Sequence, residues 1–112
     1  MAISHPDYSN PNYDNMAKAI GLKPKHMPLL IASFIEETQA IFPKLQVAVK
    51  ANDYDKIGSL SHSIKGSAGN MRFNELYDMA KEMELAGKES NATFEYAEYL
   101  EAIITATATI KI

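Results

Sequence analysis

The chain has 112 residues, of which 46% are apolar and 22% charged, enough for one modest hydrophobic core in a single domain. This length excludes a two-lobed enzyme and a kinase that carries its own nucleotide-binding domain. A formal charge of −3 without a basic stripe argues against nucleic acid as a partner, and the lack of cysteine excludes disulfides and thiolate metal sites.

Residues 1–13 combine Pro6 and Pro11 with small polar residues and show no hydrophobic period, which predicts a flexible N-terminal arm. No basic segment followed by an apolar one opens the chain, and no apolar run approaches the roughly 18 residues of a membrane span. We therefore expect a cytoplasmic protein with no membrane partner. A short helix is expected over residues 14–20, with Gly21 ending it in a left-handed conformation.

A second, longer helix is expected to begin near Pro28, because proline is tolerated in the first turn of a helix. Its apolar residues recur at helical spacing and are Leu30, Phe34, Ile35, Phe42, Leu45 and Val49. Pro43 lies inside this pattern. Since the apolar period resumes on the same face, we expect Pro43 to bend the helix rather than end it.

Three more amphipathic segments follow. Asp53 is a good N-cap for a third helix, whose apolar face is Ile57, Leu60, Ile64 and Ala68. Gly69 and Asn70 separate it from a fourth helix with inward residues Phe73, Leu76, Tyr77, Ala80 and Met83. Gly87 is expected to end that helix, and Ser90 or Asn91 to cap a fifth one that buries Phe94, Ala97, Leu100, Ile104 and Ala108.

Four amphipathic helices with short connections bury their apolar faces most simply as an antiparallel bundle. Apart from the tail over residues 103–112, where Thr alternates with Ala or Ile, no segment has a strand pattern. We therefore expect an all-α fold: one domain over residues 1–112, built as an antiparallel four-helix bundle with a short extra N-terminal helix.

His62 lies on the third helix outside its apolar face, about 140° from Ile57 at 100° per residue, so the imidazole should reach solvent. Gly58, Gly66 and Gly69 lie on the same strip of the helix. An interior glycine costs about 1 kcal/mol relative to alanine. We interpret these glycines as keeping the surface beside His62 free for the approach of another protein.

Lys65 follows His62 by one turn. Its charge disfavours a second positive charge on the ring and would stabilise a negative group arriving there. A neutral imidazole beside a lysine is suited to carrying a phosphoryl group. An isolated surface histidine usually has no function, but the combination of glycines, histidine and lysine on one strip favours the functional interpretation.

The run from Ser61 to Asn70, SHSIKGSAGN, resembles the active-site helix of histidine-containing phosphotransfer (HPt) domains, whose pattern is H-x-x-K-G followed by small residues. The resemblance covers most of the chain, with further matches at Phe34-Ile35-Glu36, Lys50-Ala51-Asn52-Asp53, Leu76, Ala80 and Met83-Glu84. It implies that His62 accepts a phosphoryl group from the aspartyl phosphate of one receiver domain and passes it to the aspartate of another. It also implies a phosphocarrier without kinase activity or a cofactor of its own, with Mg²⁺ held by the receiver.

Glu84 falls on the inward face of the fourth helix, and a buried carboxylate needs partners. The matching position of the family often bonds the active-site imidazole. By that resemblance Glu84 would accept from Nδ1 of His62 and leave Nε2 as the nucleophile. The alternative is a carboxylate that reaches solvent or pairs with a lysine.

The expected partner-binding residues are Gly58, Gly66, Ser67, Gly69 and Arg72. Arg72 follows the motif where many family members have glycine. On a continued helix it would lie near Lys65 as a second cation, but a solvated loop residue is the favoured interpretation. His5 and His26 lack the spacing of metal ligands, so we expect surface residues and no metal site.

The leading hypothesis is a monomeric phosphorelay intermediate that docks response-regulator receiver domains, and a hybrid histidine kinase upstream, through its second and third helices. A first alternative is a non-catalytic adaptor that binds receivers without carrying phosphate. A second is the phosphoacceptor domain of a chemotaxis-type histidine kinase, which shares the run His62-Ser63-Ile64-Lys65-Gly66.

Overall fold

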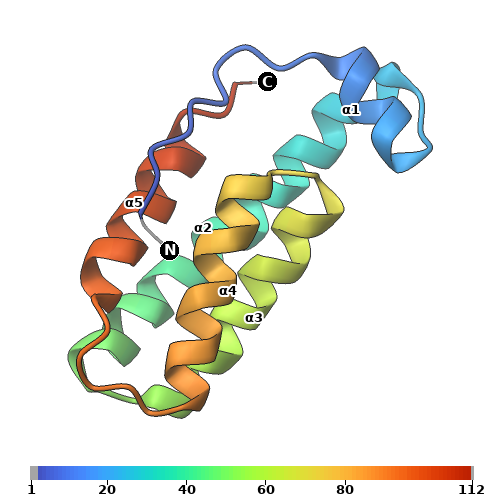
Figure 1. Cartoon of the computed structure of the whole chain (residues 1–112). Helices are drawn as coiled ribbons and strands as arrows, with labels where there is room; N and C mark the ends of the chain where they lie inside the picture. The colour runs from blue at the N-terminus through green and yellow to red at the C-terminus, as the bar shows by residue number, and fades with distance from the viewer. Residues whose placement is uncertain (1–2, 112) are drawn as a thin grey trace.

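The computed structural model describes residues 3–111, which form helices joined by short connections (Figure 1). The elements are α1 (Tyr13–Ile20), the 3₁₀ turn η1 (Pro24–His26), α2 (Met27–Lys50), α3 (Tyr54–Asn70), α4 (Asn74–Lys88) and α5 (Tyr96–Ala108). Helices α2 to α5 form an antiparallel bundle in which α5 returns to pack against α2, and α1 lies at one end. No strand occurs between residues 3 and 111, so the expected all-α bundle with a short extra helix is confirmed.

Four of the helices end with the same motif. A residue just beyond the helix takes a left-handed conformation, and the next N–H donates to the carbonyl five residues earlier. The left-handed residues are Gly21, Asn52, Arg72 and Ser90, with φ of 73°, 52°, 61° and 52°. The predicted stop at Gly21 is therefore confirmed. The predicted stop at Gly87 is wrong, because α4 continues to Lys88 and Ser90 makes the turn.

The starts of α2 and α3 follow the predictions. Pro28 lies in the first turn of α2, and that helix continues through Pro43 to Lys50. The Asp53 side chain caps α3 by accepting from the backbone N–H of Lys56 at 3.2 Å. Because α2 ends at Lys50 and Asp53 caps α3, the helix that carries His62 begins only a few residues after α2 ends.

The buried face of α5 differs from the predicted one. The helix begins at Tyr96, and Ala97 and Ala108 of the predicted face are exposed. The buried residues are instead Tyr96, Tyr99, Leu100, Ala102, Ile103, Ala106 and Thr107. The tyrosine rings enter the core because their hydroxyls find acceptors at its edge: Tyr96 bonds the carbonyl of Asn91 at 2.8 Å and Tyr99 the carboxylate of Glu82 at 3.2 Å.

The N-terminal segment before α1 runs alongside α5 in its described part (Figure 1). The backbone N–H of Tyr8 donates to Oγ1 of Thr109 at 2.9 Å, and its hydroxyl donates to Glu75 at 2.8 Å. The Tyr8 ring lies 4.6 Å from that of Phe73, centroid to centroid. The predicted arm thus has defined packing partners at Tyr8, while residues 1 and 2 lie outside the described part.

Candidate functional site

His62 lies near the middle of α3, and its side chain is 64% exposed, as the helical spacing predicted. Ile57, Ser61 and Ile64 of the same helix are buried and hold the opposite face of α3 in the core. The ring is directed to α4, where its Nδ1 atom lies 2.6 Å from Oε2 of Glu84. The structure therefore brings together the two residues that the sequence paired by resemblance.

Glu84 is nearly fully buried, with 3% of its side chain exposed, and both of its oxygens are occupied. Oε1 accepts from Nζ of Lys65 at 2.6 Å, whereas Oε2 contacts Nδ1 of His62 at 2.6 Å and Nζ of Lys88 at 3.0 Å. Burial alone would raise the pKa of Glu84, but the hydrogen bonds from Lys65, Lys88 and His62 outweigh it and lower the pKa to about 2. At neutral pH the carboxylate is ionised and acts only as an acceptor.

This ionised acceptor determines how the neutral ring is protonated. An acceptor at 2.6 Å from Nδ1 requires that Nδ1 carry the hydrogen and donate it to Glu84. The other ring nitrogen, Nε2, then has a free lone pair. Because the His62 side chain is exposed, the arrangement can offer a nucleophilic nitrogen to a group brought by another molecule.

The two lysines differ in their surroundings. Lys65 is 23% exposed, and the hydrogen bond to Glu84 raises the pKa of its ammonium. Lys88 is 64% exposed and lies four residues after Glu84 on α4. Sequence reasoning missed Lys88, although a glutamate four residues before a lysine is the favoured order for a helical ion pair. Lys65 thus holds the carboxylate from α3 and Lys88 from α4.

Two glycines bring the backbones of α3 and α4 into close contact beside these residues. A Cβ atom on Gly87 would lie 2.8 Å from the backbone N of Gly58 and 3.0 Å from the carbonyl oxygen of Tyr54. We call this contact the α3–α4 seam. The prediction that Gly58 lies on open surface for a partner is wrong, because Gly58 is buried in the seam. Helical spacing alone does not reveal where the neighbouring helix crosses.

The remaining small residues of the predicted strip have different surroundings. Gly66 is exposed, and a Cβ there would meet nothing within 4 Å, so this position offers the free space that the sequence predicted. Gly69 is half-buried, and a Cβ would lie 3.2 Å from the Tyr77 ring. The Ser67 hydroxyl donates to the Glu37 carboxylate on α2 at 3.1 Å.

Arg72 does not join the cations near His62 as part of a continued helix. Helix α3 ends at Asn70, and Arg72 is an exposed residue of the turn before α4. The loop interpretation is therefore confirmed. His5 and His26 are also exposed, and residues 3–111 contain no group of three or more His, Asp or Glu side chains that could hold a metal ion.

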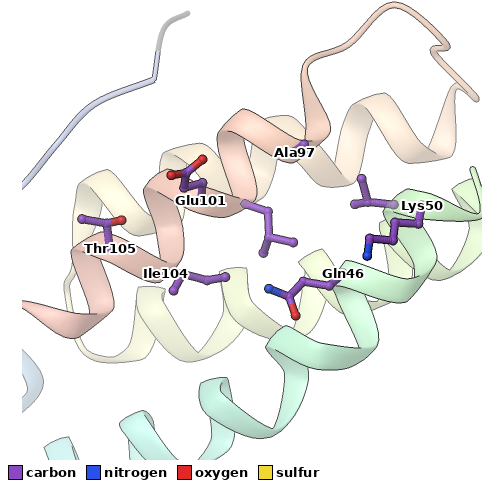
Figure 2. A pocket seen from close by; sticks show the side chains of 8 residues that line it. Gln46, Lys50, Ala97, Glu101, Ile104 and Thr105 are labelled. Carbon is purple, nitrogen blue, oxygen red and sulfur yellow. The ribbon is translucent and has the colours of Figure 1, made fainter.

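A surface groove lies between α2 and α5 (Figure 2). It has a volume of about 610 Å³ and is lined by Gln46, Val49, Lys50, Ala97, Leu100, Glu101, Ile104 and Thr105. Neither His62 nor Glu84 lines it. The oriented imidazole is instead displayed on the surface of the bundle, which is the arrangement of a protein that offers a reactive group to a partner.

The fold and the site define a helical bundle that presents one oriented histidine to solvent. The family model for the Hpt domain matches residues 29–109, from the first turn of α2 to just beyond α5. The chain belongs to the Hpt domain family, whose members carry out histidine phosphotransfer in two-component phosphorelays and interact with response-regulator receiver domains. Comparison with curated proteins and with solved structures gave no match.

Within residues 3–111, no helix has both the length and the apolar character that crossing a membrane requires.

Proposed function

We propose that this protein is a phosphorelay intermediate in which Nε2 of His62 carries a phosphoryl group between the aspartates of two receiver domains. The observation that supports this most directly is the contact of 2.6 Å between Nδ1 of His62 and the buried carboxylate of Glu84. It orients an exposed ring and favours the hydrogen on Nδ1, which supports Nε2 as the nucleophile.

The proposed transfer makes one bond and breaks one. The lone pair of Nε2 forms a bond to phosphorus while the bond between phosphorus and the aspartyl oxygen breaks, and the aspartate leaves as a carboxylate with its electron pair. The imidazole gains positive character as the nitrogen–phosphorus bond forms. Glu84 stabilises that charge through the hydrogen bond at Nδ1. The reverse step passes the group to the aspartate of a second receiver, and each receiver supplies Mg²⁺ at its own site.

Lys65 has two proposed roles. Its ammonium fixes Glu84 from α3 at 2.6 Å, and its charge favours the arrival of the phosphoryl group one turn from His62. Gly66 leaves the adjacent surface open, which supports docking of a receiver over this part of α3. We propose that the protein does this as a monomer, with a hybrid histidine kinase as one source of the phosphoryl group.

The test is to incubate the protein with a receiver domain carrying ³²P-labelled aspartyl phosphate. We expect label that is stable in base and lost in acid, as a phosphohistidine is, and no label on His62→Gln. His26→Gln is the matched control, because His26 is also exposed but has no carboxylate partner among residues 3–111, and it should be labelled as wild type. Undiminished label on His62→Gln would overturn the proposal, and a wild-type protein that binds the receiver without acquiring label would be the adaptor instead.

A further inference from the structure

Lys88 is the member of the site to which the transfer described above assigns no role. Its Nζ and the Nδ1 of His62 contact the same oxygen, Oε2 of Glu84, at 3.0 Å and 2.6 Å. The other oxygen of Glu84 is taken by Lys65. Lys88 is thus the cation that competes directly with the imidazole for one carboxylate oxygen.

The seam holds the side chain of Lys88 in this place. A Cβ on Gly58 would lie 3.5 Å from Cγ of Lys88 and 3.6 Å from its backbone N, so the stem of Lys88 lies against the bare backbone of α3. Since both nitrogens contact one oxygen, Nζ of Lys88 is at most about 6 Å from Nδ1 of His62. Its ammonium nevertheless stays accessible, with the side chain 64% exposed.

We propose that Lys88, held beside the ring by Glu84, shifts the phosphoryl equilibrium towards His62 through its positive charge. This inference rests on the proposed function of His62. Lys88 differs from Lys65 in its position on Glu84. Lys65 binds the other oxygen of the carboxylate, whereas Lys88 shares the oxygen that holds the ring.

The charge balance of the site gives the direction of the effect. With a neutral ring, Glu84, Lys65 and Lys88 together carry one positive charge. The transferred phosphoryl group adds a net charge of −1, because the ring becomes cationic when Nε2 gives its lone pair to phosphorus, so the sum becomes 0 with Lys88 and −1 without it. A unit positive charge on this neighbouring side chain, close to solvent, changes the equilibrium constant for adding that negative charge by about five- to tenfold.

The experiment compares three single variants. Lys88→Met removes the charge but keeps a long apolar stem, Lys88→Arg restores a cation, and Lys81→Met is the matched control, because Lys81 is an exposed lysine of the same helix with no contact to Glu84 among the described residues. One readout is the equilibrium distribution of ³²P between the protein and a receiver. The second is the lifetime of phosphohistidine after labelling with phosphoramidate, followed by ³¹P NMR without any receiver.

We expect Lys88→Met to move the equilibrium about five- to tenfold towards the receiver. We also expect it to shorten the lifetime of the phosphohistidine. Lys88→Arg and Lys81→Met should stay within about twofold of wild type. If Lys88→Met also stays within twofold, or if Lys81→Met shows the same shift, Lys88 has no such role, although His62 is still the carrier. A wild-type protein that takes no phosphoryl group from either donor would instead overturn the proposed function.

Discussion

The α3–α4 seam and the groove between α2 and α5 lie on opposite sides of the bundle and are built differently. In the seam the two backbones meet so closely that a single Cβ on Gly87 would come within 2.8 Å of Gly58. On the other side, α2 and α5 leave open a groove of about 610 Å³ (Figure 2). His62 lies next to the seam. This protein therefore positions the His62 ring by direct contact between two helices, and the groove between α2 and α5 takes no part in holding it.

Replacing Glu84 with Gln removes the buried charge beside the seam and should have the largest effect. The variant is isosteric, but it leaves Lys65 and Lys88 without their carboxylate. At neutral pH we expect a loss of about 3 kcal/mol in the free energy of unfolding, because the pKa of Glu84 is lowered to about 2 in the folded protein. We also expect transfer from a receiver to slow by roughly tenfold or more, since the ring loses its orienting acceptor.

The pH dependence of this difference follows from the direction of the pKa shift. A carboxyl group with a lowered pKa stabilises the fold above its ordinary pKa of 4.5, and that contribution is lost as the pH falls towards the folded value of about 2. Urea denaturation of wild type and Glu84→Gln should therefore give curves that converge between about pH 4.5 and 2. A difference that stays constant over this range would show that Glu84 contributes through packing and not through its charge.

Gly87→Ala and Gly58→Ala form a matched pair that tests the seam from its two sides. The new Cβ on Gly87 would meet backbone atoms at 2.8 to 3.1 Å, which α3 cannot relieve by turning a side chain. We expect a loss of about 1–3 kcal/mol and weaker labelling of His62, because Glu84 moves away with α4. A Cβ on Gly58 meets its nearest atoms at 3.5 Å or more, an ordinary contact.

For Gly58→Ala we therefore expect no loss of stability and a gain of up to about 1 kcal/mol from the higher helix propensity of alanine. Thermal melts followed by circular dichroism measure both variants. If the two alanines have equal effects, close backbone contact at Gly87 is not what holds the seam together.

The sequence was sufficient for features that depend on local pattern, and insufficient where two helices meet. The exposure of His62 and the cap at Asp53 were predicted from local pattern, whereas the contact between His62 and Glu84 across two helices was expected only from the family resemblance. Lys88 and the role of Gly87 were not predicted, because a helical wheel shows which residues share a face but not where another helix crosses it. The buried face of α5 was misplaced for a related reason: Tyr96 enters the core once a neighbouring carbonyl is available for its hydroxyl.

Arg72→Gly sharpens the account of the turn that joins α3 to α4. Arg72 has φ of 61°, a conformation that glycine adopts without the steric cost of a side chain. We expect the variant to gain about 0.5–1 kcal/mol in unfolding free energy, with the gain limited by the greater freedom of glycine in the unfolded chain. His62 labelling should stay at the wild-type level, because Arg72 lies beyond the end of α3. Reduced labelling would place Arg72 in receiver docking, as the set of predicted partner-binding residues included it.

The smallest effects are expected in the α2–α5 groove, at Lys50→Gln and Glu101→Gln. Both residues are exposed and line the groove, so each change should alter the free energy of unfolding by less than about 0.5 kcal/mol. The two substitutions change the net charge in opposite directions. A general electrostatic effect on receiver encounter would therefore speed transfer in one variant and slow it in the other, and higher ionic strength would remove both changes. If instead both variants slow transfer and salt does not restore it, the groove contacts the receiver, and the seam is then not the only side of the bundle that serves the reaction.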